Sequence, residues 1–304
     1  MNKQLAPLIQ QIHRLFERNN VAQQIRESLL ANLGPVAIVS DYGGEHKNAD
    51  YKTYAFLCTY LVAIKAWHNE YIMPLRERCG LRDQTIDYER LRKNDRFQRA
   101  RVLPEWLALS NRIPGTLVVV SVDKQLDTVF AQSLMELKIG MLATGFNQWS
   151  PEVLEKALRV LHILSYLMSL TTHEDQQFLW ITDRDPIANN EEQKRGLLKL
   201  WERIYPLYVK HRLQKIGVLI PEQNDPFVKD VVSIPDLAAG AVTALLTALK
   251  NKSSNALKEE AREIYNFLRG NTGKLRKILV NIPAELIEGE MGIGGELYGI
   301  SISS

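Results

Sequence analysis

Four aspartates lie where an apolar run ends or a helix-forming segment begins, so their carboxylates are the first candidates for chemistry. The run PVAIVS ends at Asp41, TLVVVSV ends at Asp123, FLWIT ends at Asp183, and Asp236 precedes LAAGAVTALLTAL. Loops at the carboxyl ends of strands are where α/β folds place their sites, so these side chains can meet at one sheet edge. Carboxylates with no supporting Cys or His suit a hard cation such as Mg²⁺ or Mn²⁺. Two such ions about 3.5–4 Å apart can hold the attacking water and the leaving oxygen of a phosphodiester.

Each of these aspartates also has a purely structural interpretation. Asp is common in the turns that follow strands, and Asp236 is a natural N-cap for the helix that we expect from 236 to 249. The set of four is therefore more informative than any one of its members.

The elements that must position these residues are strands that alternate with long helices. The spacing of apolar residues predicts a helical hairpin within residues 3–32. Strands are predicted at 35–40, 51–64, 116–122, 178–182 and 216–220, and helices at 65–78, 150–171, 191–214 and 236–249. This order predicts one layered α/β fold rather than two separable domains.

Basic residues are concentrated in two stretches, although the net charge of the chain is only +3. Residues 82–101 carry seven Lys/Arg against four Asp/Glu, and residues 250–277 carry eight against three. Clustered cations are typical of proteins that bind the phosphate backbone, because binding releases condensed counterions. A solvated helix face is the alternative interpretation. If the first stretch binds nucleic acid, the residues that contact the backbone are Arg90, Arg92, Lys93, Arg96 and Arg99.

The segments around the aspartates also resemble a known family. VAIVSDYGG around Asp41, followed by the strand YAFL, is similar to the opening of the ribonuclease-H-like family known as domain of unknown function 3800. Later segments resemble the further motifs of that family in the same order: DYERL at 87–91, VVVSVDK at 118–124, WITD at 180–183 and IPDLAAG at 234–240. The resemblance covers about residues 35–250.

The resemblance implies a mixed five-stranded sheet flanked by helices, with Mg²⁺ bound between carboxylates. It implies a catalytic set of Asp41, Asp183 and Asp236 with either Asp87 or Glu89, and a metal bound by Asp41, Asp87, Asp183 and Asp236. It also implies that Asp123 is less central and that Lys124 contacts phosphate.

Together these patterns predict a metal-dependent nuclease that hydrolyses phosphodiester bonds of nucleic acid. Its ribonuclease-H-like domain would span 35–250, with a helical extension at 1–34 and a C-terminal extension at 251–304. The two extensions are candidates for contact with a protein partner or a second copy of the chain. The alternative is a non-catalytic interaction or scaffold protein on the same fold, because Tyr42 and Pro235 replace the Glu and Ala of the family pattern.

Composition limits the remaining classes. With 45% hydrophobic and 24% charged residues the chain is an ordinary globular protein rather than a disordered one. Its longest weakly polar run, at 237–249, is shorter than the roughly 18–20 residues of a membrane span. No secretory signal is visible at the N-terminus, and Cys58 and Cys79 form neither a disulfide framework nor a zinc motif. We therefore expect a cytoplasmic protein without membrane contact.

Overall fold

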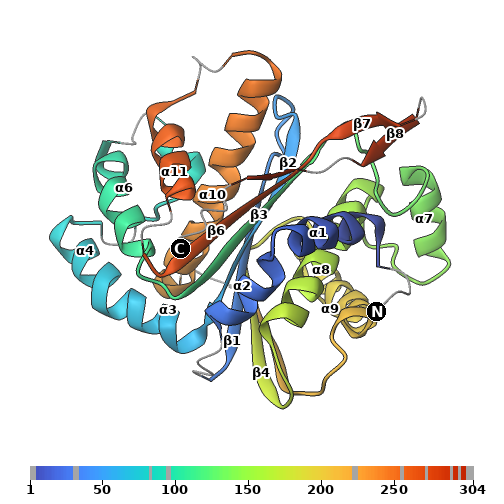
Figure 1. Ribbon diagram of the computed structural model, residues 1–304, viewed down its shortest axis with the longest axis horizontal. Helices are drawn as coiled ribbons and strands as arrows, with labels where there is room; N and C mark the ends of the chain where they lie inside the picture. The colour runs from blue at the N-terminus through green and yellow to red at the C-terminus, as the bar shows by residue number, and fades with distance from the viewer. Residues whose placement is uncertain are drawn as a thin grey trace.

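A seven-stranded mixed sheet runs through the middle of the described part of the computed structural model, in the order β5-β4-β1-β2-β3-β6-β9 (Figure 1). The first three strands pair antiparallel, β4 and β5 run parallel to β1, β6 runs parallel to β3, and β9 runs antiparallel to β6. The strands are β1 Val36–Gly43, β2 Tyr51–Tyr60, β3 Gly115–Asp123, β4 Gln176–Thr182, β5 Leu213–Leu219, β6 Leu275–Ile282 and β9 Glu296–Tyr298. The structure describes residues 5–29, 34–81, 84–93, 97–220, 225–253, 257–270, 273–287, 290–293 and 296–298.

Helices cover both faces of this sheet (Figure 1). One face carries α3 Leu61–Trp67, the π-helical turn η1 His68–Ile72, α4 Met73–Arg78, α5 Tyr88–Leu91, α6 Phe97–Ser110, α10 Pro226–Lys250 and α11 Glu259–Arg269. The other face carries α1 Pro7–Arg18, α2 Val21–Ser28, α7 Leu134–Leu142, α8 Pro151–Thr171 and α9 Glu191–Tyr208. A separate hairpin pairs β7 Ala284–Ile287 with β8 Glu290–Ile293. We call the two sides the α10 face and the α8 face.

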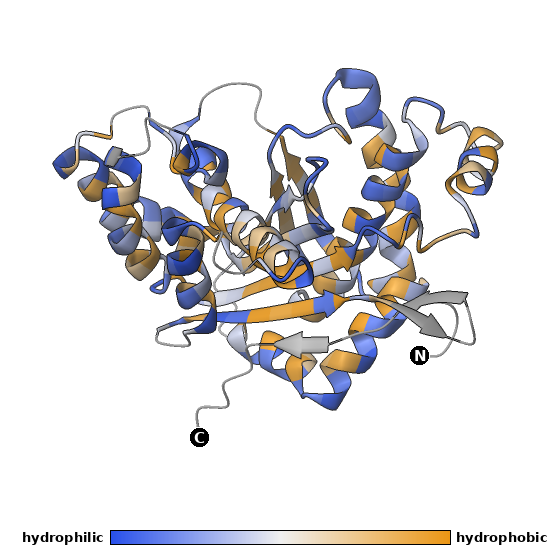
Figure 2. Cartoon of the chain, turned by 90° about the horizontal axis from the view of Figure 1, so that it is seen from above, coloured by the Kyte–Doolittle hydropathy of each residue, from blue (hydrophilic) through white to orange (hydrophobic). Residues whose placement is uncertain are grey.

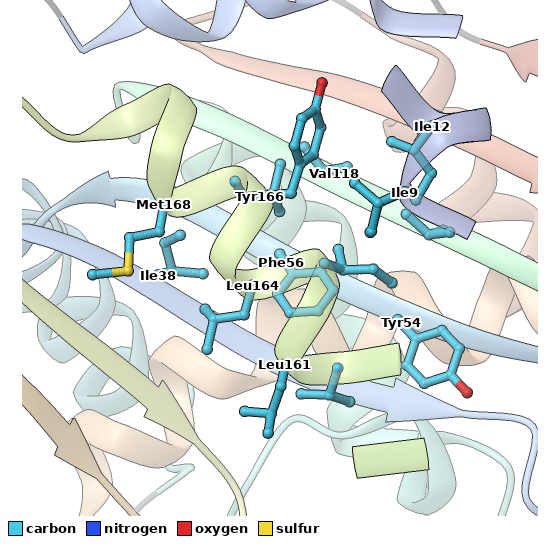
Figure 3. Close-up of a cluster of buried hydrophobic side chains, with 14 of the residues drawn as sticks. Ile9, Ile12, Ile38, Tyr54, Phe56, Val118, Leu161, Leu164, Tyr166 and Met168 are labelled. Carbon is cyan, nitrogen blue, oxygen red and sulfur yellow. The ribbon is translucent and has the colours of Figure 1, made fainter. Parts of the chain in front are cut away.

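The alternation of side chains along β1 divides the interior into two cores. Ile38 packs in the core of the α8 face, whereas Ala37 and Val39 pack in the core of the α10 face. Figure 3 shows Ile38 and Phe56 of the sheet against Leu161 and Leu164 of α8. The strands are therefore mainly hydrophobic, while the surrounding helices combine hydrophobic and hydrophilic residues (Figure 2).

The structure confirms the α/β class and most of the expected elements. The N-terminal hairpin is α1 and α2, and the expected cap of α8 is formed because the Ser150 hydroxyl accepts a hydrogen bond from the Val153 N–H at 3.4 Å. The strand expected at 51–64 ends earlier, since the chain turns into α3 at Leu61. The sequence analysis did not predict α6, α7, α11 or β6. Because β6 belongs to the main sheet, that sheet continues beyond residue 250, where we placed the start of an extension.

Helix α10 differs most from its prediction. It begins at Pro226, with Asp225 as its N-cap, so Asp236 lies inside the helix and is not its cap. Pro235 also lies inside α10. Burial of the apolar side chains of α10 against β1 and β2 outweighs the poor helix propensity of proline. The helix is long and apolar enough to cross a bilayer, but 67% of its most apolar window is buried, as in a core helix.

Candidate functional site

A cavity of about 440 Å³ opens at the edge of the sheet where β1 and β4 end. Its wall contains all five carboxylates of the expected catalytic set, namely Asp41, Asp87, Glu89, Asp183 and Asp236. They come from segments as far apart in the chain as β1 and α10. We call this space the carboxylate cavity.

Strand pairing places the first two carboxylates side by side. Asp41 follows Ala37 and Val39 at two-residue steps, so it faces α10 as they do. Ser40 is the register partner of Thr182 in the parallel pair, and the next residues along the two strands are Asp41 and Asp183. One oxygen of each carboxylate accepts a hydrogen bond at 2.7 Å from the N–H of the following residue, which fixes its orientation.

Helix α10 brings the third carboxylate against the short helix α5. Asp236 accepts a hydrogen bond of 2.6 Å from the Tyr88 N–H, the first residue of α5. One turn later in α10, Gly240 leaves the space in which the Tyr88 ring lies, because a Cβ there would be 2.2 Å from two ring atoms. Asp87 caps α5 by accepting a hydrogen bond of 2.8 Å from the Arg90 N–H. The spacing of Asp236 and Gly240 on one helix face therefore determines where Asp87 lies.

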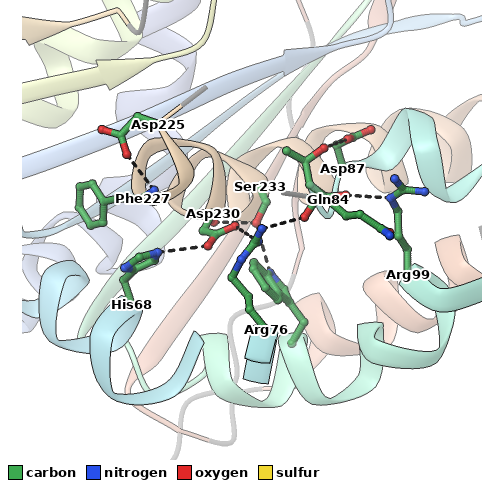
Figure 4. A network of polar contacts seen from close by, with 11 residues as sticks. His68, Arg76, Gln84, Asp87, Arg99, Asp225, Phe227, Asp230 and Ser233 are labelled. Carbon is green, nitrogen blue, oxygen red and sulfur yellow. Dashed lines mark hydrogen bonds and ion pairs between the residues drawn. The ribbon is translucent and has the colours of Figure 1, made fainter. Parts of the chain in front are cut away.

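A buried polar network holds the segment that leads into Asp87 (Figure 4). Arg76 donates to Asp230 of α10 at 2.7 Å and to the Gln84 carbonyl at 3.1 Å. Arg99 donates to the Thr85 carbonyl at 2.9 Å, and the Thr85 hydroxyl donates to Asp87 at 2.7 Å. The segment from 84 to 87 is thus connected to both α10 and α6.

The carboxylates of the cavity repel one another. Burial, and then the nearby charge of Asp236, raises the pKa of Asp41 well above its usual range. Burial also raises the pKa of Asp236 to about 7, and the charges of Asp87 and Asp183 add to this. The carboxyl groups of Asp41 and Asp236 lie close enough for a hydrogen bond, which would require a proton on one of them. The pair therefore holds a proton near neutral pH, where an isolated Asp would be ionised.

The donor set suits a hard divalent cation, which would replace that proton. Within the described residues, no group of three or more His, Cys, Asp or Glu side chains is arranged to hold a metal ion. Asp41 and Asp236 are already in contact, and Asp183 is an exposed side chain in the same cavity. Asp183 and Asp87 are the cavity aspartates from which a third ligand would come.

The fourth aspartate of the set, Asp123, lies outside the carboxylate cavity. Asp123 is buried and forms an ion pair of 2.7 Å with Lys250. The adjacent Lys124 donates to the His46 carbonyl at 2.8 Å and does not line the cavity. Asp123 is thus a neutralised structural group, in agreement with the less central role that the resemblance implies.

The basic residues expected to bind phosphate have different environments. The prediction that Arg99 contacts the phosphate backbone does not fit the structure. Arg99 is buried and donates to the Thr85 carbonyl, so it does not face substrate. Arg90 lines the cavity and pairs with Asp87 at 3.2 Å, and Lys93 pairs with Glu89 at 2.8 Å. Arg92 is exposed near the Tyr88 ring, and Arg96 lies outside the described residues.

Sequence reasoning missed four polar residues that line the carboxylate cavity, namely Thr85, Arg184, Lys229 and Ser233. Arg184 directly follows Asp183, so its position alone could have indicated it. Lys229 and Ser233 precede Asp236 by seven and three residues and share its helix face. That periodicity was not recognised because the helix was expected to begin at 236.

Comparisons with protein-family models, curated proteins and solved structures returned no match. The geometry of the cavity and the resemblance of its motifs are therefore the two grounds for assigning a function.

Proposed function

We propose that the protein is a metal-dependent nuclease that hydrolyses phosphodiester bonds of nucleic acid in the carboxylate cavity. The observation that carries the proposal is the convergence of Asp41, Asp183 and Asp236 in one cavity, with raised pKa values for Asp41 and Asp236. A protein gains nothing in stability by gathering acids without cationic partners in one cavity, so a bound cation explains the cluster better.

The same proposal includes a ribonuclease-H-like fold. Its support is a mixed sheet in which the three consecutive antiparallel strands β1–β3 are followed by β4 and β5, both parallel to β1. Helices on both faces and the position of the acids at one sheet edge agree with the expectation drawn from the motifs.

The proposal gives each group in the cavity a role. Asp41, Asp183, Asp236 and Asp87 would hold Mg²⁺ or Mn²⁺, which supplies a bound water of lowered pKa and stabilises the charge on the phosphate. Glu89 is exposed at the same cavity and is the alternative to Asp87. Arg184, Arg90 and Lys229 line the wall and would bind the phosphate backbone without reading its sequence.

A titration of Mg²⁺ and Mn²⁺ against single-stranded and double-stranded DNA, RNA and a DNA–RNA hybrid tests this function. We expect cleavage that depends on the divalent ion. Asp41→Asn should lower its rate more than about a hundredfold and keep the fold, because it removes a ligand without changing shape. Asp123→Asn is the matched control, because it removes a strand-end carboxylate outside the cavity. Equal rates for Asp41→Asn and the wild type would exclude Asp41 from catalysis.

A non-catalytic nucleic-acid-binding protein on the same fold is the second candidate. The observation that favours it is the lack, within the described residues, of a ready group of three metal ligands. It predicts that calorimetry detects no Mg²⁺ or Mn²⁺ binding, whereas binding to nucleic acid still weakens steeply as salt is added. Divalent-ion binding that Asp41→Asn abolishes would exclude it.

A further inference from the structure

Lys156 of α8 is a buried cation close to the carboxylate cavity but on the opposite face of the sheet. Its side chain is 8% exposed. The ammonium group contacts the carboxylates of both Glu45 and Asp185, and it lies 4.9 Å from the centre of the Tyr42 ring. A buried lysine with two acidic partners and an aromatic ring has a defined position.

These three partners belong to the two segments that carry the first pair of cavity carboxylates. Tyr42 directly follows Asp41, and Glu45 lies three residues further along the same segment. Asp185 lies two residues after Asp183. A single side chain from α8 therefore connects the end of β1 to the end of β4, just where each strand delivers its aspartate to the other face.

Neighbouring hydrogen bonds strengthen this connection. The Tyr42 hydroxyl lies 2.8 Å from the Ser40 hydroxyl and 3.2 Å from that of Thr182, so it spans β1 and β4 behind the carboxylates. Asp185 also accepts a hydrogen bond of 3.2 Å from the Ile187 N–H, which folds the chain back after β4. The side chains directly behind Asp41 and Asp183 are thus polar and joined by hydrogen bonds and ion pairs, with Lys156 at their centre.

Removing the cation would leave Glu45 and Asp185 facing each other without compensation. Two carboxylates that both contact one ammonium group repel each other once it is removed. The segments that carry them can then move apart, because Glu45 is exposed. The expected result is a wider and more variable separation of Asp41 and Asp183.

We propose that Lys156 is a positioning residue that sets the separation of Asp41 and Asp183 and thereby the affinity of the cavity for its divalent ion. It contacts neither metal nor substrate, and it acts through the two strand ends that it connects. The effect on metal affinity rests on the proposed function, whereas the effect on the strand ends does not.

The test compares Lys156→Met and Lys156→Arg with the wild type in two measurements. Hydrogen exchange without metal should show faster exchange in residues 41–46 and 183–188 of Lys156→Met than in the wild type. Calorimetric titration with Mn²⁺ should show affinity about tenfold weaker in Lys156→Met, as for residues that orient metal ligands. Lys156→Arg should recover most of both losses, because it keeps the charge. Lys52→Met is the matched control, since Lys52 lines the same small pocket as Lys156 without an ion pair in the described structure.

A second variant covers the case in which Lys156→Met does not fold. Glu45→Gln removes one arm of the connection at an exposed residue, and we expect about threefold weaker Mn²⁺ binding with faster exchange confined to 41–46. Lower stability with unchanged exchange in both segments and unchanged Mn²⁺ affinity would overturn the inference. If the wild type cleaves no nucleic acid but exchange responds as expected, the proposed function fails and the positioning role stands.

Discussion

Two groups of carboxylates on opposite faces of the sheet edge differ in how their charges are compensated. On the α8 face, Glu155 pairs with Arg159 at 2.7 Å, and Asp185 pairs with Lys156. On the α10 face, Asp41 and Asp236 contact each other, and the pKa of each is raised. Both faces bury acids, so burial alone does not mark a site. The difference is that the chain supplies a compensating cation for Glu155 and Asp185, as it does for Asp230 of α10, whereas Asp41 and Asp236 have no ion-pair partner within the described residues.

The largest effect on stability should come from breaking an ion pair on the α8 face. Glu155 is fully buried and accepts hydrogen bonds from Arg159, from the Thr128 hydroxyl at 2.7 Å and from the Val129 N–H at 3.0 Å. Glu155→Gln leaves the buried Arg159 charge without its counter-charge, so we expect the free energy of unfolding to fall by about 3–5 kcal/mol. Urea denaturation measures this loss. A change below about 1 kcal/mol would mean that Arg159 finds another partner.

The next effect concerns the packing that positions Asp87. Gly240→Ala places a Cβ into the Tyr88 ring, so Tyr88 and α5 must shift, and we expect a loss of about 2 kcal/mol with weaker Mn²⁺ binding. Gly140→Ala is the matched control, because a Cβ at Gly140 of α7 meets nothing within 4 Å and alanine favours the helix by up to about 1 kcal/mol. Equal stability and equal Mn²⁺ affinity for the two variants would show that α5 tolerates displacement.

Removing a carboxylate from the carboxylate cavity should raise stability rather than lower it. The raised pKa values mean that the folded protein holds a proton that the unfolded chain releases above about pH 4, so stability without metal falls as pH rises from about 4 to about 7. Asp41→Asn removes this repulsion. We expect it to raise the free energy of unfolding at pH 7.5 in EDTA by about 1–2 kcal/mol, with no gain below pH 4.

Denaturation of both proteins across this pH range provides the measurement. Added Mg²⁺ should stabilise the wild type and leave Asp41→Asn unchanged, since a ligand stabilises only the state that binds it. A loss of stability in Asp41→Asn at pH 7.5 would contradict the unpaired character of the cavity.

The strand-end aspartates show how much of the site could be predicted from sequence. Asp41 and Asp183 both line the cavity, because an apolar run ends beside each of them and parallel pairing makes them neighbours. Asp123 has the same local pattern. What separates it from the others is Lys250, which lies 127 residues away and reaches it through the fold. Local pattern therefore predicts where a carboxylate lies, but its charge partner depends on tertiary structure.

Charge runs were a weaker guide for the same reason. Arg99 belongs to a basic stretch of sequence, yet it is buried and holds the Thr85 carbonyl. Lys277 likewise interrupts the apolar pattern of β6, and for this reason the sequence analysis did not predict that strand. The ammonium group of Lys277 is buried and donates to the carbonyl of Gly270 at 2.7 Å. The partners of both cations lie on other elements, so composition could not show that these charges are structural.

The smallest effect, on nucleic-acid affinity, should distinguish cations that line the carboxylate cavity from cations on the α8 face. Arg184 is exposed in the cavity wall, and Arg184→Gln should remove one phosphate contact. We expect affinity for single-stranded nucleic acid to fall about threefold, and the slope of log affinity against log salt to decrease by about 0.7. Lys199→Gln removes one exposed charge from α9 on the α8 face and should change neither quantity. If both variants shift the slope equally, the strand is attracted by overall charge rather than held at the cavity.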